Sequence, residues 1–182
     1  MESTNSIVSV LDKNFEVLLD ESVIRSRIQE LGKELNEQYK DKDPLFIAIL
    51  NGSFIFAADL YREITVPSDI SFIKLSSYSN LQSTGKIREL IGLQKNIFKR
   101  NIVLIEDIID SGLTMVWLIE HLQELGPSSI EMVSLLVKPE AMSNKLKPGY
   151  VGFEIPNKFV VGYGLDYNGY GRNLKDVYQL IE

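Results

Sequence analysis

The sequence predicts an α/β fold with a central, mostly parallel sheet flanked by helices, and three features support that prediction. Apolar runs typical of strands buried on both faces occur at residues 45–50, 102–105 and 130–137. Segments with apolar residues at helical spacing separate these runs, as expected when helices connect parallel strands. No linker, composition break or internal repeat divides the chain, so we expect a single domain spanning residues 1–182.

Ahead of the first of these runs, the chain predicts a short strand and a long helix. Residues 1–14 are polar and expected to be loosely held, and residues 15–19 form an apolar strand. Asp20 is placed to cap a helix that runs to about Tyr39. The apolar face of this helix carries Ile24, Ile28, Leu31 and Leu35. We assign this helix to packing and expect no catalytic residue on it.

The remaining segments complete the predicted sheet. Strands are predicted at 70–77 and 159–166, with a returning strand at 90–93, and helices at 54–62 and 113–125. The polar residues 78–86 are long for a connection in a compact domain. They form either a mobile lid over a site or the tip of a hairpin.

Composition restricts the chemistry that is available. Lys and Arg number 19 against 25 Asp and Glu, a net charge of −6, which argues against a general nucleic-acid binder. The chain has no cysteine and one histidine, which excludes disulfides, thiol nucleophiles and histidine-cluster metal sites. Any metal is expected to be a hard cation bound by oxygen atoms. No segment resembles a signal peptide or a membrane span, so we expect a cytoplasmic protein without a membrane partner.

The most informative segment joins the strand at 102–105 to the helix that begins near Leu113. Two acids, Glu106 and Asp107, follow the strand directly, and after two aliphatic residues comes Asp-Ser-Gly-Leu-Thr at 110–114. A strand that enters a helix through a small polar loop suits a phosphate, because the free N–H groups of the first helical turn can face the anion.

The acids beside this loop require an explanation of their own. Asp110 or Ser111 could be an ordinary helix N-cap, worth about 1 kcal/mol. Capping does not account for Glu106 and Asp107, whose charges would be costly to bury after an apolar strand. Such carboxylates fit better if they bind sugar hydroxyl groups or Mg²⁺, or accept a proton.

Two weaker features gain weight beside this motif. Residues 51–53, Asn-Gly-Ser, follow the strand at 45–50 and are either a plain turn or a second phosphate-binding loop. Lys138 follows the strand at 130–137 and is either solvated or part of a site, since α/β sheets bind ligands at the carboxyl ends of their strands.

Residues 102–114 resemble the phosphoribosyl-diphosphate motif of type I phosphoribosyltransferases: an apolar strand, Glu-Asp, two aliphatic residues and Asp-Ser/Thr-Gly-x-Thr. Further segments resemble the hypoxanthine(-guanine) phosphoribosyltransferases in the same order, at residues 50–54, 76–87, 134–140 and 158–180. The similarity covers nearly the whole chain from about Phe15. It implies the type I phosphoribosyltransferase fold, with a small hood, a mobile lid loop and often a strained peptide between Leu50 and Asn51.

The resemblance implies an enzyme of purine salvage. It would transfer the 5-phosphoribosyl group from phosphoribosyl diphosphate to hypoxanthine and guanine, giving IMP or GMP and pyrophosphate, with Mg²⁺ as cofactor. No nucleic acid would take part, and the family suggests a homodimer or homotetramer. The lid would close over the leaving group and exclude water, because hydrolysis competes with transfer.

The resemblance also assigns residues to these roles, with Asp110 as the catalytic acid/base. The expected 5-phosphate and ribose site comprises Glu106, Asp107, Asp110, Ser111, Gly112, Leu113 and Thr114. The expected pyrophosphate site comprises Leu50, Asn51, Gly52, Lys74, Ser77, Tyr78 and Arg172. The expected purine site comprises Lys138, Phe159, Val160, Leu165 and Asp166. The expected metal ligands are Glu106, Asp107 and Asp166.

Some positions depart from the family, and three alternatives stay open. Leu113 often corresponds to Lys in relatives, but it would contribute mainly its backbone N–H, so we expect little loss there. Asn51 and Ser76 stand where some relatives carry Lys, which weakens the case for cationic pyrophosphate contacts. A regulatory protein of the same fold that binds RNA or DNA would have a basic surface, whereas this chain is acidic. A receiver-type signalling domain would explain acids at strand ends but not residues 111–114. The same reaction on xanthine would differ only in pocket shape.

Overall fold

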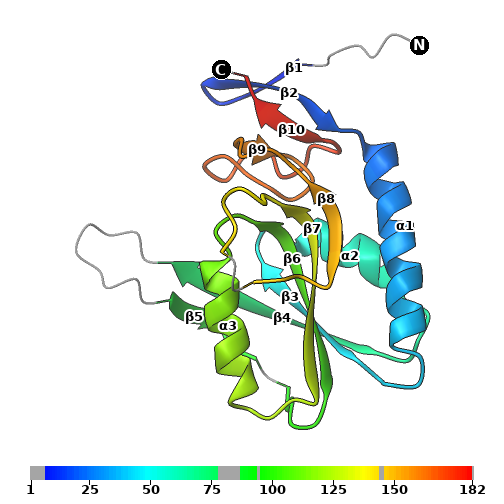
Figure 1. The fold of residues 1–182 in the computed structure, drawn as a ribbon. Coiled ribbons are helices and arrows are strands. Elements are labelled where there is room, and N and C mark those ends of the chain that lie inside the picture. The colour runs from blue at the N-terminus through cyan, green and yellow to red at the C-terminus, as the bar shows by residue number, and fades with distance from the viewer. Residues whose placement is uncertain (1–6, 78–86, 94, 144–145, 182) are drawn as a thin grey trace.

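The computed structural model describes residues 7–77, 87–93, 95–143 and 146–181 and contains two sheets (Figure 1). The larger sheet has six strands with helices on both faces, and the smaller sheet, with four strands, stands at one end of it (Figure 1). This arrangement confirms the predicted α/β fold with a small hood. The lid predicted at 78–86 lies outside the described residues.

Five neighbouring strands of the large sheet are parallel, and the sixth, at one edge, is antiparallel. Their order is β5-β4-β3-β6-β7-β8. In chain order the strands are β3 (Leu45–Leu50), β4 (Asp69–Ser77), β5 (Ile87–Ile91), β6 (Asn101–Ile109), β7 (Ser129–Val137) and β8 (Tyr150–Glu154). β5 pairs with β4 in the antiparallel direction. The central strands are apolar along most of their length because helices cover both of their faces.

Three helices cover the large sheet. α1 (Glu21–Gln38) and α2 (Phe54–Arg62) lie on one face, and α3 (Leu113–Gln123) lies on the other (Figure 1). Alternate residues of β3 divide between the two cores, since successive side chains point to opposite faces. Phe46 packs with α1 and α2, whereas Ile47 packs with α3.

α1 forms as the sequence predicts. The Asp20 carboxylate accepts a hydrogen bond from the Ser22 N–H at 2.8 Å and caps the first turn. The predicted apolar face is buried, namely Ile24, Ile28, Leu31 and Leu35. The C-cap is Tyr39, where the helix was expected to end.

The hood joins the two ends of the described chain. Its strands, in the order β1-β2-β10-β9, are β1 (Ile7–Val10), β2 (Lys13–Leu19), β10 (Val177–Leu180) and β9 (Val160–Val161). All of these pairs are antiparallel. A small core of Val10, Phe15, Val161 and Tyr178 holds the hood together, so the C-terminal segment is fixed against the start of the chain.

Several sequence predictions about these elements are wrong. Residues 7–10 are not loosely held but pair with β2, through a turn in which Leu11 has φ 53°. The strand predicted at 159–166 is only two residues long, because the glycines at 162 and 164 adopt positive φ and turn the chain. The sequence does not predict β8 or β10, which have five and four residues and depend on their pairing partners.

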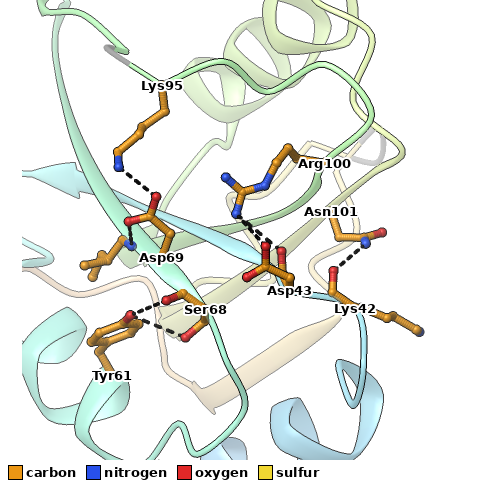
Figure 2. A network of polar contacts seen from close by, with 9 residues as sticks. Lys42, Asp43, Tyr61, Ser68, Asp69, Lys95, Arg100 and Asn101 are labelled. Carbon is orange, nitrogen blue, oxygen red and sulfur yellow. Dashed lines mark hydrogen bonds and ion pairs between the residues drawn. The ribbon is translucent and has the colours of Figure 1, made fainter.

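Ion pairs secure the amino edge of the large sheet (Figure 2). Lys95 Nζ lies 2.7 Å from the Asp69 carboxylate at the start of β4. Arg100 Nη2, just ahead of β6, lies 3.6 Å from the Asp43 carboxylate, just ahead of β3. Structural polar contacts thus gather at this edge, whereas the acids and glycines of the predicted site lie at the opposite, carboxyl edge.

Candidate active site

A pocket of about 310 Å³ lies at the carboxyl edge of the large sheet, between the loops that follow β3 and β6. In the sheet, β3 is flanked by β4 on one side and by β6 on the other. The connection after β3 leads to β4, whereas the connection after β6 leads to β7 in the opposite direction across the sheet. Open α/β sheets leave a ligand-binding crevice at such a point. Both predicted phosphate-binding loops contribute to the lining: Leu50, Asn51, Gly52, Glu106, Asp107, Asp110, Ser111, Gly112 and Thr114.

The loop after β3 leads directly into α2. The peptide bond between Leu50 and Asn51 is cis. Ser53 is buried, and its hydroxyl donates a hydrogen bond to the Ile49 carbonyl at 2.5 Å. Gly52 packs against the side chain of Asp107 in β6: a Cβ at this position would lie 1.6 Å from Asp107 Oδ2. A residue with a side chain at position 52 would therefore displace the Asp107 carboxylate or the loop itself.

The loop after β6 leaves the start of α3 open. The N-cap residue is Gly112, at φ 71°, which has no side chain to cap the helix. Ser111 Oγ lies 3.4 Å from the Leu113 N–H, a distant contact, and Asp110 makes no capping bond within the described chain. The alternative that Asp110 caps this helix is therefore wrong. N–H groups at the start of α3 remain available for an anion, and the Leu113 side chain is largely exposed.

Glu106, which is partly buried, and Asp107, which is buried, form a carboxyl pair that lines this pocket. Burial, the neighbouring Asp107 charge and the hydrogen bond between them raise the pKa of Glu106 well above its ordinary value. Burial also raises the pKa of Asp107, against the opposing effects of hydrogen bonds and the Arg172 charge. Within the described residues, Glu106 Oε2 is buried without a hydrogen-bond partner. The raised pKa favours the protonated form of Glu106 more than in a free glutamate, and Oε2 remains free to pair with a ligand.

Glu106→Gln is expected to stabilise the ligand-free protein at neutral pH. The folded state keeps the Glu106 proton that the unfolded chain releases above about pH 4.5, so stability is lost as pH rises from there toward the folded pKa. Glutamine has no proton to release. We expect a gain of about 1 kcal/mol, or about 2–4 °C in Tm, at pH 7 and none below pH 4.5.

Thermal melts from pH 4 to pH 8 with a chelator present would measure this difference. Glu37→Gln, which changes an exposed glutamate on α1, is the control and should not alter the pH dependence. Parallel Tm profiles for Glu106→Gln and the unmodified chain would contradict the assignment of the proton to Glu106.

Asp110 and Lys138 form an ion pair at the rim of the pocket. Lys138 Nζ lies 2.8 Å from Asp110 Oδ1, with 8% of the lysine side chain and 59% of the aspartate side chain exposed. The Lys138 N–H also donates to the Ile109 carbonyl at 2.9 Å, which joins the ends of β6 and β7. The alternative that Lys138 is a solvated lysine is therefore wrong. Its ammonium is pre-positioned with further donor capacity, beside an accessible carboxylate.

The hood supplies aromatic and apolar residues next to this edge. The Phe159 ring is 44% exposed and meets Tyr167 edge-on, with centroids 5.8 Å apart. Part of the ring is accessible for stacking. Val160 and Leu165 are almost fully buried, so a ligand would meet mainly their backbone groups.

Arg172 organises the acidic end of the hood. Its guanidinium contacts Asp166 Oδ1 at 2.6 Å and donates to the Gly164 carbonyl at 2.6 Å. The other Asp166 oxygen accepts from the Gly169 N–H at 2.6 Å. Arg172 is also close enough to Asp107 for its charge to lower the pKa of that carboxyl. The charge of Arg172, next to the hood, therefore acts on Asp107 near the end of β6.

The predicted metal ligands do not form a preassembled cluster. Among the described residues, no group of three His, Cys, Asp or Glu could hold a metal ion. In the ligand-free chain Asp166 is paired with Arg172, and Glu106 and Asp107 hydrogen-bond to each other, so the assignment of these three carboxylates to a metal stays a prediction. Hard oxygen donors and the unpartnered Glu106 Oε2 still suit Mg²⁺ whose remaining ligands are water and phosphate oxygens.

Three residues of the predicted pyrophosphate site remain, and the structure gives at most their position along the chain or in the sheet. Lys74 is the register partner of Leu50 and therefore lies beside the first loop. Ser77 ends β4, and Tyr78 lies outside the described residues. The sequence did not point to two further candidates, Tyr163 and Asp59, which hydrogen-bond to each other. The glycines on both sides of Tyr163 are the signal of an unusual backbone there, but nothing local points to Asp59.

Comparison with known protein families resolves the identity of the fold. The family model described as the phosphoribosyl transferase domain matches residues 16–168. The chain belongs to the phosphoribosyltransferase family. Its resemblance to that family is thereby confirmed, and a receiver-type signalling domain is excluded.

Relatives of this phosphoribosyltransferase are hypoxanthine-guanine phosphoribosyltransferases. That of Mycobacterium avium is 43% identical over 165 residues, which cover 87% of this chain and 81% of the relative. That of Bacillus subtilis is 43% identical over 159 residues, covering 87% and 88%. A crystal structure of the enzyme from Bacillus anthracis superimposes with a TM-score of 0.87 at 37% identity, covering 97% of this chain and 100% of the other.

These matches extend through the site as well as the core. They span the β3 loop, the β6 loop and Lys138, so they include the residues of the candidate site. In the described part of the chain, no helix is long and apolar enough to cross a membrane.

Proposed function

We propose that this phosphoribosyltransferase transfers the 5-phosphoribosyl group from phosphoribosyl diphosphate to hypoxanthine and guanine, as the names of its relatives indicate for them. The observation that carries the proposal is the Asp110–Lys138 pair at the rim of a pocket bounded by two anion-binding loops. One partner can accept a proton while the other donates to an oxygen, and both functions are needed on a 6-oxopurine.

Phosphoribosyl diphosphate would occupy the 310 Å³ pocket. Its 5-phosphate suits the open N-terminus of α3, with the hydroxyl groups of Ser111 and Thr114 as further donors. The ribose hydroxyl groups suit Glu106 and Asp107, because the unpartnered Glu106 Oε2 needs a donor. The pyrophosphate suits the backbone of residues 50–52, where Lys74 and Arg172 are the nearby cations.

The reaction forms a bond between a purine ring nitrogen and C1′ of the ribose. The C1′–oxygen bond to pyrophosphate breaks, and both of its electrons leave with the pyrophosphate. The Asp110 carboxylate takes the proton that the purine ring loses, acting as a general base. Lys138 holds Asp110 in place through the 2.8 Å contact and donates to the exocyclic oxygen of the purine.

The purine would lie between this pair and the hood. Phe159 offers a partly exposed ring for stacking, and the backbone groups of Val160, Leu165 and Asp166 can read the remaining edges of the base. An adenine lacks the oxygen that Lys138 would recognise, and its amino group would face the ammonium donor instead. The site should therefore discriminate against adenine.

Mg²⁺ is the cofactor that this chemistry calls for, and Glu106, Asp107 and Asp166 would hold it or its bound water molecules. When bound, the ion would neutralise charge that develops on the departing pyrophosphate.

A product assay tests the proposal. Phosphoribosyl diphosphate and Mg²⁺ are supplied with hypoxanthine, guanine, xanthine or adenine in separate reactions. Formation of inosine or guanosine monophosphate, with adenine inert, is the expected result. A chain that binds phosphoribosyl diphosphate and gives no product with any base would favour the regulatory alternative. Product from xanthine alone would keep the reaction and change the substrate.

Lys138→Ala is expected to raise the KM for hypoxanthine and guanine by roughly 10-fold or more, as a hydrogen bond from a charged donor is worth about 1.5–3 kcal/mol. The KM for phosphoribosyl diphosphate should change little. Steady-state kinetics with each substrate varied in turn would measure the difference. The control is Lys175→Ala, a lysine whose side chain is 79% exposed and lies 4.0 Å from Glu21 on α1. A variant that loses thermal stability but keeps its KM for the base would assign Lys138 a purely structural role.

We also propose that the chain is a cytoplasmic homodimer or homotetramer. Large apolar side chains are exposed on the single chain, including Val23, Phe54 and Phe72, and subunit contacts would cover such residues. Light scattering coupled to size-exclusion chromatography would give the assembly mass, and a monomer at micromolar concentration would contradict this assignment.

A further inference from the structure

We propose that Tyr163 and Asp59 act as a positioning pair, whose hydrogen bond holds the purine-reading turn of the hood at a set distance from the pyrophosphate loop. This inference rests on the proposed function, and it adds two residues to the machinery of that reaction. Neither residue lines the main pocket, so their effect would be exerted through the segments that they join.

Tyr163 lies in a turn that few residues tolerate. Gly162, Tyr163 and Gly164 have φ of 95°, 49° and 100° in succession. Positive φ is easy for glycine but costs energy for a bulky residue, and it persists where surrounding contacts enforce it. The Tyr163 side chain is almost fully buried, and its hydroxyl donates to Asp59 Oδ2 at 2.5 Å. This hydrogen bond is one of the contacts that hold the turn.

The same turn touches the pyrophosphate loop. A Cβ on Gly164 would lie 2.2 Å from the Gly52 carbonyl oxygen, so the two backbones are in close contact. Leu165 and Asp166 follow directly, and the Arg172 guanidinium binds both the Gly164 carbonyl and the Asp166 carboxylate. A shift of this turn would therefore move the hood side of the purine site.

Asp59 belongs to the element on the other side of that contact. It lies on α2, which begins at Phe54 immediately after the loop. A helix is stiff over this length, so a bond to Asp59 is in effect a second attachment to the loop. The contact between Gly164 and Gly52 alone would let the turn rotate about that point. With the hydrogen bond to Asp59 as a second contact, both the distance and the angle between the turn and the loop are set.

The simpler explanation is that Asp59 merely satisfies a buried hydroxyl group. Tyr61 offers a comparison for Tyr163. It lies on α2, as Asp59 does, and its hydroxyl donates to the Ser68 carbonyl at 3.2 Å (Figure 2). That bond lies at the amino edge of the sheet, away from the pocket. Loss of either hydroxyl should cost stability, and more for Tyr163, whose hydrogen bond is to a carboxylate. Only loss of the Tyr163 hydroxyl should alter the site.

The experiment compares Tyr163→Phe, Asp59→Asn and the double variant with Tyr61→Phe. Melting temperatures, kcat and the KM for each substrate are measured for all. For Tyr163→Phe we expect the KM for hypoxanthine to rise roughly 5-fold, as for loss of one net hydrogen bond, with a smaller change in kcat. The double variant should equal Tyr163→Phe, because loss of the hydroxyl already removes the whole hydrogen bond. Asp59→Asn keeps an acceptor and should be milder.

Amide hydrogen exchange adds a measurement that does not depend on turnover. Peptides that cover 162–166 should exchange roughly 5-fold faster in Tyr163→Phe than in Tyr61→Phe. If Tyr163→Phe has the hypoxanthine KM and the exchange rates of Tyr61→Phe, the pair is only structural and the inference is overturned. If the unmodified chain makes no nucleotide from any base, the proposed function fails, and the exchange data still decide whether the pair fixes the turn.

Discussion

Asp110→Asn is expected to lower kcat by about 10²–10⁴-fold while leaving the fold intact, because that is the usual contribution of a positioned general base. Asparagine keeps the shape of the side chain and can still accept a hydrogen bond from Lys138, but it cannot take a proton at neutral pH. The 59% exposure of the Asp110 side chain leaves it open to a substrate, so the variant should lose chemistry more than binding.

Single-turnover rates and equilibrium binding of phosphoribosyl diphosphate would separate chemistry from binding for this variant. Asp43→Asn provides the control: it is the same substitution at an exposed aspartate of the amino edge, paired there with Arg100. Turnover unchanged in Asp110→Asn would remove the acid/base role and leave Asp110 as the partner of Lys138 alone.

Gly52→Ala is expected to weaken phosphoribosyl diphosphate binding by about 100-fold, the order of loss that a displacement of about 1 Å can cause in a site. The new Cβ would lie 1.6 Å from Asp107 Oδ2, so either the Asp107 carboxylate or the loop at 50–52 must move. The backbone itself does not require glycine, since Gly52 is absent from the residues with positive φ. The effect should therefore come from Asp107 and not from backbone strain.

A double-mutant cycle tests that cause. If the clash with Asp107 explains the loss, Gly52→Ala combined with Asp107→Ala should bind no worse than Asp107→Ala alone. Binding can be measured by calorimetry with phosphoribosyl diphosphate and Mg²⁺. Additive losses in the double variant, or full affinity in Gly52→Ala, would contradict the packing of Gly52 against Asp107 as the reason for glycine at this position.

Local sequence signals predicted the elements whose cause is local. The helix capped by Asp20 and the helix at 54–62 appear with the expected bounds, since capping and apolar periodicity act within a few residues. The motif at 106–114 was also readable, because its order of acids, glycine and hydroxyl residues is contiguous.

Local sequence signals did not predict the contacts between segments that lie far apart along the chain. The 2.8 Å pair of Asp110 and Lys138 depends on β6 and β7 lying side by side with their ends aligned. The alternatives that Asp110 is a cap and Lys138 is solvated were each reasonable for an isolated residue. The ion pair across the two strands overturned the solvated lysine, and the N-cap at Gly112 overturned the Asp110 cap.

The sequence by itself determined the α/β class, the main helices and the identity of the chemical groups, because these follow from periodicity, capping and residue type. Tertiary structure alone decided which groups meet. It formed the hood from short strands at both ends of the chain, brought Gly52 against Asp107, and joined Tyr163 to Asp59. Such contacts depend on strand order and on close packing between segments far apart in the chain, and no local pattern of residues encodes either one.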